Sequence, residues 1–248
     1  MKSDSRRRTL IDALVVFSCV VLTTSYGSGR PDPRITPGGS GQESSTTAPL
    51  LYADFESEEG GRPVSKRGGF TQLTSFSESP ARPSRHNGAA GASPPAPELV
   101  RLQKDNPNRA AAFDYELQSP NEYAGVALEV RGQAEKDGKP VADDVSAYKY
   151  LSMQIYATGV PALRVEFQSS GQGVTVTGAP PQASFRIKSG FNTYRIPLNS
   201  LAQPQWVERK VNPKDVLKKL TSVSVVTFCD KCTPVNGTVV VDNIIFER

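Results

Sequence analysis

Short segments in which apolar and polar residues alternate, separated by turn residues, dominate the chain from Arg109 onward. In ALRVEFQ (162–168), the apolar Leu163, Val165 and Phe167 alternate with charged or amide residues, which is the period of a strand with one buried face. Further segments of this kind lie at 110–117, 122–130, 148–158, 184–188, 191–198, 220–228 and 237–246. The short spacing of these eight segments predicts a β-sandwich or a β-barrel.

One segment has helical signals instead. In NPKDVLKKL (212–220), Asn212 can cap a helix, Pro213 suits its first turn, and Lys218 lies near its end, where a cation is favoured. The sequence therefore predicts an all-β fold with one short helix.

The N-terminal residues have the order of a secretory signal peptide. Three arginines at 6–8 precede an apolar run from Leu10 to Leu22, and the small residues Ser25 and Gly27 follow. The apolar run is short for a membrane span. We therefore expect residues 1–27 to be a cleaved signal peptide and the protein to be secreted or held in the periplasm or cell envelope. An uncleaved anchor or a lipoprotein is the alternative.

Two biased stretches divide the remaining chain. Residues 28–49 are rich in Gly, Ser, Thr and Pro, which predicts a disordered tether, and residues 50–248 then form one domain. Residues 77–98, which have a similar bias, are expected to be a long disordered loop within it. The net charge is only +4 and the basic residues are scattered, so nothing indicates a nucleic-acid partner.

The cysteines are consistent with export. Cys19 lies in the predicted signal peptide, which leaves the C-x-x-C pair Cys229 and Cys232. In an oxidising compartment this pair should form a disulfide, which is our main interpretation. A zinc site would need two more ligands, and His86 is the only histidine. A thioredoxin-like redox motif would begin a helix, whereas this pair follows the predicted strand at 222–228.

The C-terminal segment GTVVVDNIIFER (237–248) contains an acid within an apolar run. On a regular strand, Asp242 shares a face with Val240, Ile244 and Phe246, so it should point inward. A buried carboxylate needs a partner.

Five segments in this order resemble the galactose-binding-like β-jelly-roll superfamily over about residues 50–248. They are DFESEEGG (54–61), AAAFDYELQSPNEYAGVALEV (110–130), DDVSAYKYLSMQIYATG (143–159), FNTYRIPLNSLAQPQW (191–206) and VVVDNIIFER (239–248). The nearest branches are carbohydrate-binding modules of the family 11 type and the complex I intermediate-associated domain. The resemblance implies a two-sheet antiparallel jelly-roll sandwich, with glycans often lying across a concave face.

The resemblance also implies a structural calcium ion where acids of the first strand meet the Asp of the last strand. Asp54, Glu56 and Asp242 match those positions. Calcium binds six to eight oxygens, many of them from backbone carbonyls. The alternative is that Asp242 accepts hydrogen bonds from backbone or side-chain groups without a metal.

A carbohydrate-binding function needs aromatic rings for sugar C–H faces and charged or amide groups for hydroxyls. Provided that their strands share a sheet, such groups would gather on one polar face: Tyr156, Gln154, Arg164, Glu166, Arg186 and Arg195. A solvated face with Arg–Glu pairs is the alternative for each. Trp206 is the only tryptophan. The resemblance implies that this loop position is apolar or aromatic and packs beneath the sheet edge, and a ligand platform is the alternative.

We therefore expect a monomeric, non-catalytic carbohydrate-binding module, with a polysaccharide or glycan as its partner. Two alternatives stay open. One is a protein-interaction or assembly domain, which has a protein partner. The other is a jelly-roll polysaccharide lyase or glycosidase, although the sequence contains no nucleophile elbow, P-loop or His-based triad.

Overall fold

The computed structural model describes residues 48–76, 85–87, 95–130, 141–169, 174, 176, 178–231 and 233–248. Residues 45–248 group into one compact unit. The predicted signal peptide (1–27), nearly all of the predicted tether (28–49) and most of the predicted loop (77–98) lie outside the described residues. Within the described part of the chain, no helix is long and apolar enough to cross a membrane.

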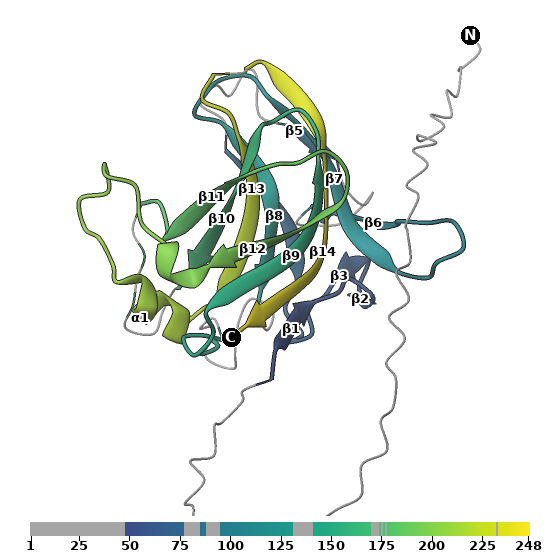
Figure 1. Cartoon of the computed structure of the whole chain (residues 1–248). Coiled ribbons are helices and arrows are strands. Elements are labelled where there is room, and N and C mark those ends of the chain that lie inside the picture. The colour runs from purple at the N-terminus through teal and green to yellow at the C-terminus, as the bar shows by residue number, and fades with distance from the viewer. Residues whose placement is uncertain are drawn as a thin grey trace, which may run out of the picture. The chain divides into compact units, whose positions relative to one another are not determined.

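Two antiparallel sheets make up the fold (Figure 1). The seven-stranded sheet has the order β12-β9-β14-β7-β5, with β1 also paired to β14 and β6 to β7. Its strands are β1 (Leu50–Ala53), β5 (Arg85–Asn87), β6 (Glu98–Arg101), β7 (Arg109–Leu117), β9 (Tyr150–Ala157), β12 (Asn192–Pro197) and β14 (Val235–Glu247).

The five-stranded sheet has the order β11-β10-β13-β8-β4. Its strands are β4 (Thr71–Phe76), β8 (Tyr123–Glu129), β10 (Ala162–Gln168), β11 (Gln182–Arg186) and β13 (Ser222–Phe228). A small hairpin joins β2 (Glu58–Glu59) and β3 (Arg62–Pro63), and a 3₁₀ turn, η1 (Leu198–Ser200), follows β12. The predicted all-β jelly-roll sandwich is confirmed.

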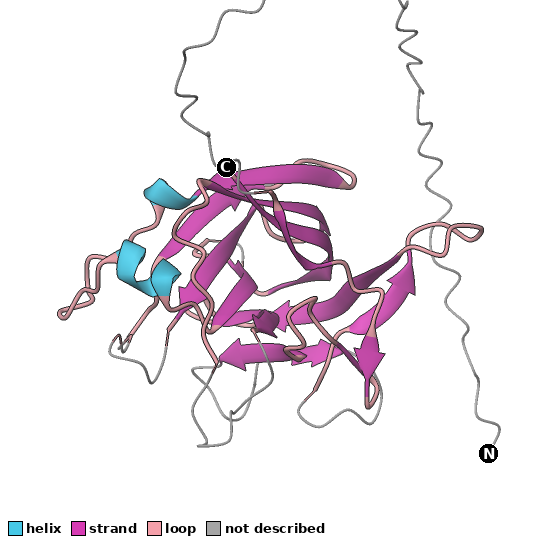
Figure 2. Cartoon of the chain, turned by 90° about the horizontal axis from the view of Figure 1, so that it is seen from below, coloured by secondary structure: helices cyan, strands magenta, loops and turns pink. Residues whose placement is uncertain are grey.

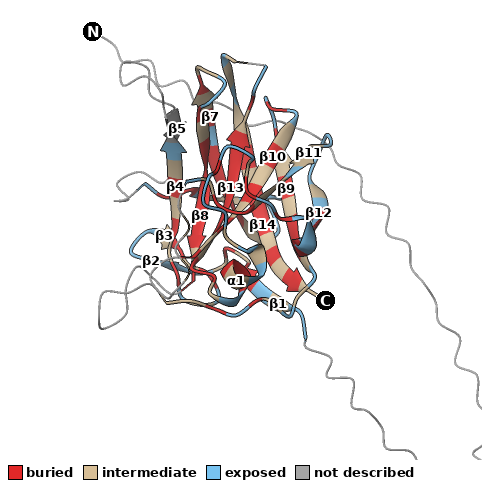
Figure 3. Cartoon of the chain, turned by 90° about the vertical axis from the view of Figure 1, so that its left-hand side faces the viewer, coloured by how far each residue is buried: buried red, intermediate tan, exposed pale blue. Residues whose placement is uncertain are grey.

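The core lies between the two layers of strands seen in Figure 2. Buried positions alternate along the strands, as the red bands of Figure 3 show. In β10, Leu163, Val165 and Phe167 are fully buried, as the alternation predicted. Burying an apolar side chain of this size contributes about 1.5–3 kcal/mol, so the alternation itself fixes which face of β10 points outward.

The helix α1 (Pro213–Lys218) forms where the sequence predicted it. The Asn212 side chain caps it, because its Oδ1 accepts a hydrogen bond from the Lys214 backbone N–H at 3.0 Å. Val216 and Leu217 of this helix are buried in the core.

A β-bulge changes the facing of β14. The pairing of β14 with β9 shifts between Asp242 and Ile245, and Asn243 adopts a left-handed φ of 49°. Val241 and Ile244 therefore both face the core, whereas Asp242 faces the outer side of the sheet beside Gln154. The expectation that Asp242 points into the core with Ile244 and Phe246 is wrong, because the extra residue reverses the alternation. Asp242 is nevertheless fully buried.

The strands β9 and β10 are consecutive in the chain but belong to different sheets. The chain crosses between the sheets at 158–161, where Gly159 has a φ of +87°. A Cβ at this position would lie 2.3 Å from the Asn236 carbonyl oxygen, so both the backbone conformation and the close approach require glycine. This crossing sends the polar faces of β9 and β10 to opposite outer faces of the sandwich.

Candidate functional site

A groove of about 870 Å³ lies on the outer face of the five-stranded sheet. Its floor is built from outward-facing residues of two neighbouring strands, Arg164, Glu166 and Gln168 of β10 and Gln182 and Ser184 of β11. Four loops or strand ends form its walls. They are Pro120–Tyr123, Gly178–Pro180, the loop with Pro204 and Trp206, and the end of β13 with Phe228 and Asp230. The groove therefore combines charged, amide and aromatic side chains.

An ion pair lies at the centre of the floor. Arg164 Nε donates a hydrogen bond to Glu166 Oε1 at 2.7 Å, and an Arg164 Nη atom lies 2.6 Å from the same oxygen. The two residues are two positions apart on β10, so their side chains share one face. Their side chains are only 20% and 13% exposed, so solvent screens this pair less than an exposed one. The Arg164 guanidinium also lies over the Phe228 ring, 5.3 Å from its centroid.

Two aromatic residues lie at one end of the groove. Tyr123 of β8 and Phe228 of β13 are opposite each other in the sheet register, and both line the groove. The pKa of Tyr123 is raised, first by burial and then by the Glu166 carboxylate, while Arg164 lowers it. The phenol thus lies close enough to the ion pair for both charges to act on it.

Trp206 forms part of the groove wall and is 70% exposed, so the expectation that it packs beneath the sheet edge is wrong. Its loop is attached next to Gln182, whose backbone exchanges two hydrogen bonds with Ala202. The buried Gln203 side chain donates from Nε2 to the Ala179 carbonyl at 2.7 Å and accepts at Oε1 from the Val211 N–H at 2.6 Å. An ordered loop thus presents an exposed indole.

The six predicted ligand residues do not share one face. Arg164, Glu166 and Arg186 lie on the outer face of the five-stranded sheet, and the first two line the groove. Arg186 is exposed at the end of β11, opposite Ala162, and is not among the lining residues.

Gln154, Tyr156 and Arg195 lie on the outer face of the seven-stranded sheet. There, the Arg195 guanidinium stacks 3.6 Å from the centroid of the Tyr150 ring and its Nε donates to Glu247 at 2.8 Å. The Gln154 side chain accepts a hydrogen bond from Asn243 at 3.4 Å. The structure therefore divides the predicted set between two surfaces.

Several groove residues were not predicted from the sequence. The predicted ligand residues did not include Tyr123, Phe228, Gln168, Gln182 or Ser184. The alternation predicted which residues of β8 and β13 point outward. It did not predict the pairing that brings these strands close to β10. Gln182 also lines the floor, but its Oε1 is buried and has no hydrogen-bond partner.

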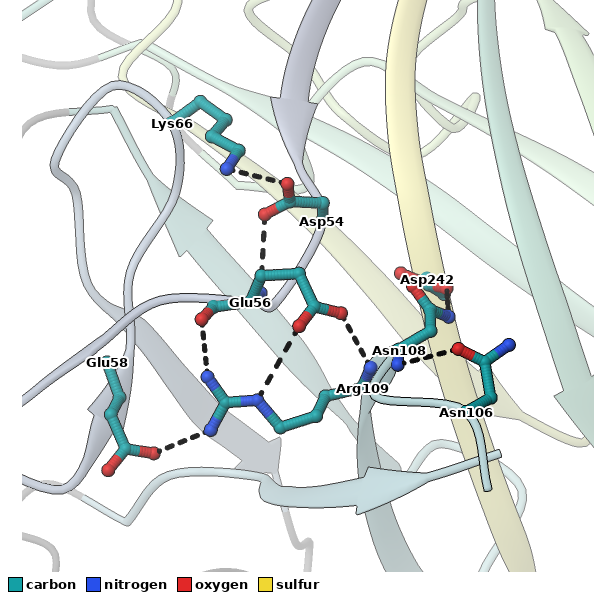
Figure 4. A network of polar contacts seen from close by, with 8 residues as sticks. All are labelled: Asp54, Glu56, Glu58, Lys66, Asn106, Asn108, Arg109 and Asp242. Atoms are coloured by element: carbon teal, nitrogen blue, oxygen red, sulfur yellow. Dashed lines mark hydrogen bonds and ion pairs between the residues drawn. The ribbon is translucent and has the colours of Figure 1, made fainter. Parts of the chain in front are cut away.

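The predicted metal residues belong to a separate polar network (Figure 4). Lys66 Nζ lies 2.6 Å from Asp54 Oδ2, and the Arg109 backbone N–H donates to Glu56 Oε1 at 2.6 Å. Asp242 Oδ2 accepts from Asn108 Nδ2 at 2.9 Å, and Asp242 Oδ1 accepts from the Asn243 N–H at 2.7 Å. The predicted hydrogen-bond partners of Asp242 are therefore present.

The carboxylates of this network influence one another. Burial raises the pKa of Asp242, the hydrogen bonds from Asn108 and Asn243 lower it, and the charges of Glu56 and Asp54 raise it. The network contains the carboxylates of Asp54, Glu56, Glu58 and Asp242 and the cations Lys66 and Arg109, so an excess of negative charge stays with it when all are ionised. This charge and the oxygen donors fit a divalent cation. Among the described residues, however, no three Asp, Glu, His or Cys side chains are already grouped as a metal site.

The predicted disulfide involves the end of β13. Cys229 is buried directly after this strand and next to the groove residue Phe228. Cys232 lies outside the described residues, so the Cys229–Cys232 bridge stays a prediction.

No protein-family model and no curated protein matches the chain. Solved structures do match. The family 11 carbohydrate-binding module of a cellulosomal cellulase from Clostridium thermocellum is similar, with a TM-score of 0.51 and 16% identity over 82% of this chain and 96% of that chain. A Clostridium thermocellum family 11 module in complex with a β-1,3-1,4-mixed-linked tetrasaccharide gives a TM-score of 0.50 and 17% identity over 82% of this chain and 97% of that chain. The likeness shows that the chain has the fold of these modules, as the resemblance predicted.

Proposed function

We propose that the protein is an exported, non-catalytic carbohydrate-binding module and that the groove on the five-stranded sheet is its glycan site. The observation that carries this proposal is the Arg164–Glu166 floor enclosed by Tyr123, Phe228 and the exposed Trp206. Concave sites with a few convergent polar groups among aromatic rings are the usual form of small-ligand sites.

The groove supplies both kinds of contact that a sugar needs. Sugar C–H faces can stack on the ring of Trp206 and on Tyr123 or Phe228, which bury apolar surface at low entropic cost. Hydroxyl groups can accept from the unused N–H donors of Arg164 and donate to Glu166.

The length of the groove favours a chain over a single sugar. Tyr123 and Phe228 lie near the first half of β10, and the Trp206 loop is attached near its second half. Arg164 and Gln168 are four positions apart on this strand, a span of roughly 13 Å at the rise of an extended strand. We therefore propose an oligosaccharide segment of a polysaccharide as the ligand.

The first ligand to test is a mixed-linked β-1,3-1,4-glucan, because one similar module was solved in complex with a tetrasaccharide of this type. Affinity gel electrophoresis in soluble mixed-linked β-glucan, other β-glucans and galactans would measure retardation of the purified protein. We expect Trp206→Ala and Tyr123→Ala each to weaken binding by about tenfold or more, because each removes a stacking surface.

Tyr156→Ala is the matched control, because Tyr156 is an outward tyrosine on the other sheet. If Tyr156→Ala lost retardation and Trp206→Ala kept it, the glycan would bind to the seven-stranded sheet and the groove assignment would be wrong. If no glycan retards the protein, a protein-interaction role replaces the carbohydrate-binding proposal.

Export is part of the same proposal. It is supported by the arginines, the apolar run and the small residues within residues 1–27. The mass of the protein recovered outside a secreting host cell would test it, and a mass that includes the full N-terminus would argue against cleavage.

A further inference from the structure

The charges of the groove are unbalanced toward acid. Of the described residues that line it, Arg164 is the one cation, whereas Glu122, Glu166 and Asp230 are acids. A ligand that carries carboxylate or sulfate groups would meet this excess of negative charge in a partly desolvated groove, where solvent screens it poorly.

The one cation among these residues, Arg164, is already paired with Glu166. Arg164 directs Nε and one Nη toward Glu166 Oε1, at 2.7 and 2.6 Å. Because both residues come from β10, the pair forms within one strand and needs no ligand to assemble. An anionic ligand that drew Arg164 away would leave the carboxylate of Glu166, which is only 13% exposed, without its cation.

An uncharged ligand does not have this difficulty. Hydroxyl groups can accept from the guanidinium N–H groups that Glu166 does not use, and they can donate to the carboxylate. The ion pair then stays intact while both of its members contact the sugar.

We propose that the groove selects uncharged glycans over anionic ones, and that Glu166 sets this selectivity by holding Arg164. This inference rests on the proposed function, because it concerns the same groove.

The test compares neutral polysaccharides with their carboxymethylated derivatives, which keep the same backbone but carry ionised carboxymethyl ethers in place of some hydroxyl groups. The salt dependence of binding separates the effect of this charge from that of the added bulk. The full chain is run by affinity gel electrophoresis in β-glucan, carboxymethyl-β-glucan, galactan and carboxymethyl-galactan. We expect the carboxymethylated form of the bound polymer to be bound at least tenfold more weakly. In Glu166→Gln, the preference should shrink by about tenfold or more, because the substitution removes an acid and releases Arg164.

Glu247→Gln is the matched control. Glu247 pairs with Arg195 at 2.8 Å on the outer face of the other sheet, so its substitution changes the net charge equally and also breaks an Arg–Glu pair. This variant should keep the wild-type preference. Equal shifts in both variants would mean that overall charge, and not Glu166, sets the preference, which would overturn the inference.

Salt provides a readout that does not depend on a folded Glu166→Gln variant. Raising the ionic strength to about 0.5 M reduces the Debye length to a few Å and so weakens the repulsion between the groove acids and the carboxymethyl groups. Wild-type binding to the carboxymethylated polymer should therefore improve relative to binding to the neutral polymer. Equal binding of both polymers at low salt would overturn the selectivity and leave the glycan site standing. Binding of neither would overturn the proposed function itself.

Discussion

At the scale of single residues, Asp242 shows how a carboxylate is kept within an apolar strand. It is fully buried, and amide and backbone N–H groups of Asn108 and Asn243 donate to both of its oxygens. These donors favour the charged form, while burial and the nearby carboxylates of Glu56 and Asp54 favour the protonated form. The pKa of Asp242 is raised, so the unfavourable contributions are larger.

This shift predicts a pH dependence of stability. Because the folded pKa lies above the ordinary 3.8, the folded state binds the proton more tightly than the unfolded state does. The stabilising contribution of Asp242 is therefore complete below about pH 3.8 and is lost as the pH rises through the folded pKa. As the pH rises through this range, the free energy of unfolding should fall less in Asp242→Asn than in the wild type. Urea unfolding at several pH values, with a chelator present, would measure this difference.

Asp105→Asn, which changes an exposed carboxyl group, is the control and should follow the wild type. At neutral pH, we expect Asp242→Asn itself to be less stable by about 1–3 kcal/mol, because its amide N–H₂ would face donors from Asn108 or Asn243. Parallel pH curves for the wild type and Asp242→Asn would contradict the assignment.

At the scale of elements, the sequence predicted where the strands lie better than how they pair. The alternation along β10 was enough to predict that Leu163, Val165 and Phe167 are buried and that Arg164 and Glu166 point outward. Nothing in that local pattern encodes the partner strand. The chain crosses between the sheets at Gly159, so β9 and β10 separate and the predicted ligand set divides into two.

Two further features were hidden for physical reasons. Asparagine can adopt the left-handed conformation that reverses the facing of β14 at Asn243, but it does not require it, so the residue type alone does not place the bulge. The exposure of Trp206 depends on hydrogen bonds made by Gln203 to residues on either side in the sequence. The groove was therefore predicted in part, through Arg164 and Glu166, and its aromatic walls were not.

The Trp206 loop gives a prediction at this scale. Gln203→Ala should destabilise the protein by about 1–3 kcal/mol, because the Ala179 carbonyl and the Val211 N–H would lose their buried partner. It should also weaken glycan binding, since Trp206 would no longer be held in one orientation. Thermal unfolding, tryptophan fluorescence and affinity electrophoresis would measure these effects.

Gln205→Ala is the matched control, because Gln205 is an exposed glutamine in the same loop. It should leave stability and binding close to the wild type. If Gln203→Ala behaved like this control, the loop would be held by other contacts.

At the scale of the whole molecule, the network of Asp54, Glu56 and Asp242 connects segments that lie far apart in the sequence, after the first strand and within the last one. We propose that calcium can join this network. Burial is the main cause of the raised pKa of Asp242, and the charges of Glu56 and Asp54 add to it, so a divalent cation would offset the repulsion among these carboxylates. The melting temperature should then be higher in millimolar Ca²⁺ than in chelator. The difference should be smaller in Glu56→Gln, which removes one of the three carboxylates.

Mg²⁺ at the same concentration controls for general ionic effects, because it demands smaller, stricter octahedral sites. Equal melting temperatures in Ca²⁺ and in chelator would show that the hydrogen bonds and the Lys66 and Arg109 contacts are sufficient without a metal.

The first and last described strands of the sandwich are direct neighbours. Leu50 of β1 is opposite Phe246 of β14. In Figure 1, the C label accordingly lies near β1. Opposite residues on antiparallel strands have Cα atoms only about 4.5–5.5 Å apart. A host protein could therefore carry residues 50–248 as an insertion within one of its surface loops without stretching its own backbone. For the same reason, a short linker from Arg248 to Leu50, with new termini opened at 189–191, should give a circular permutant that keeps the groove.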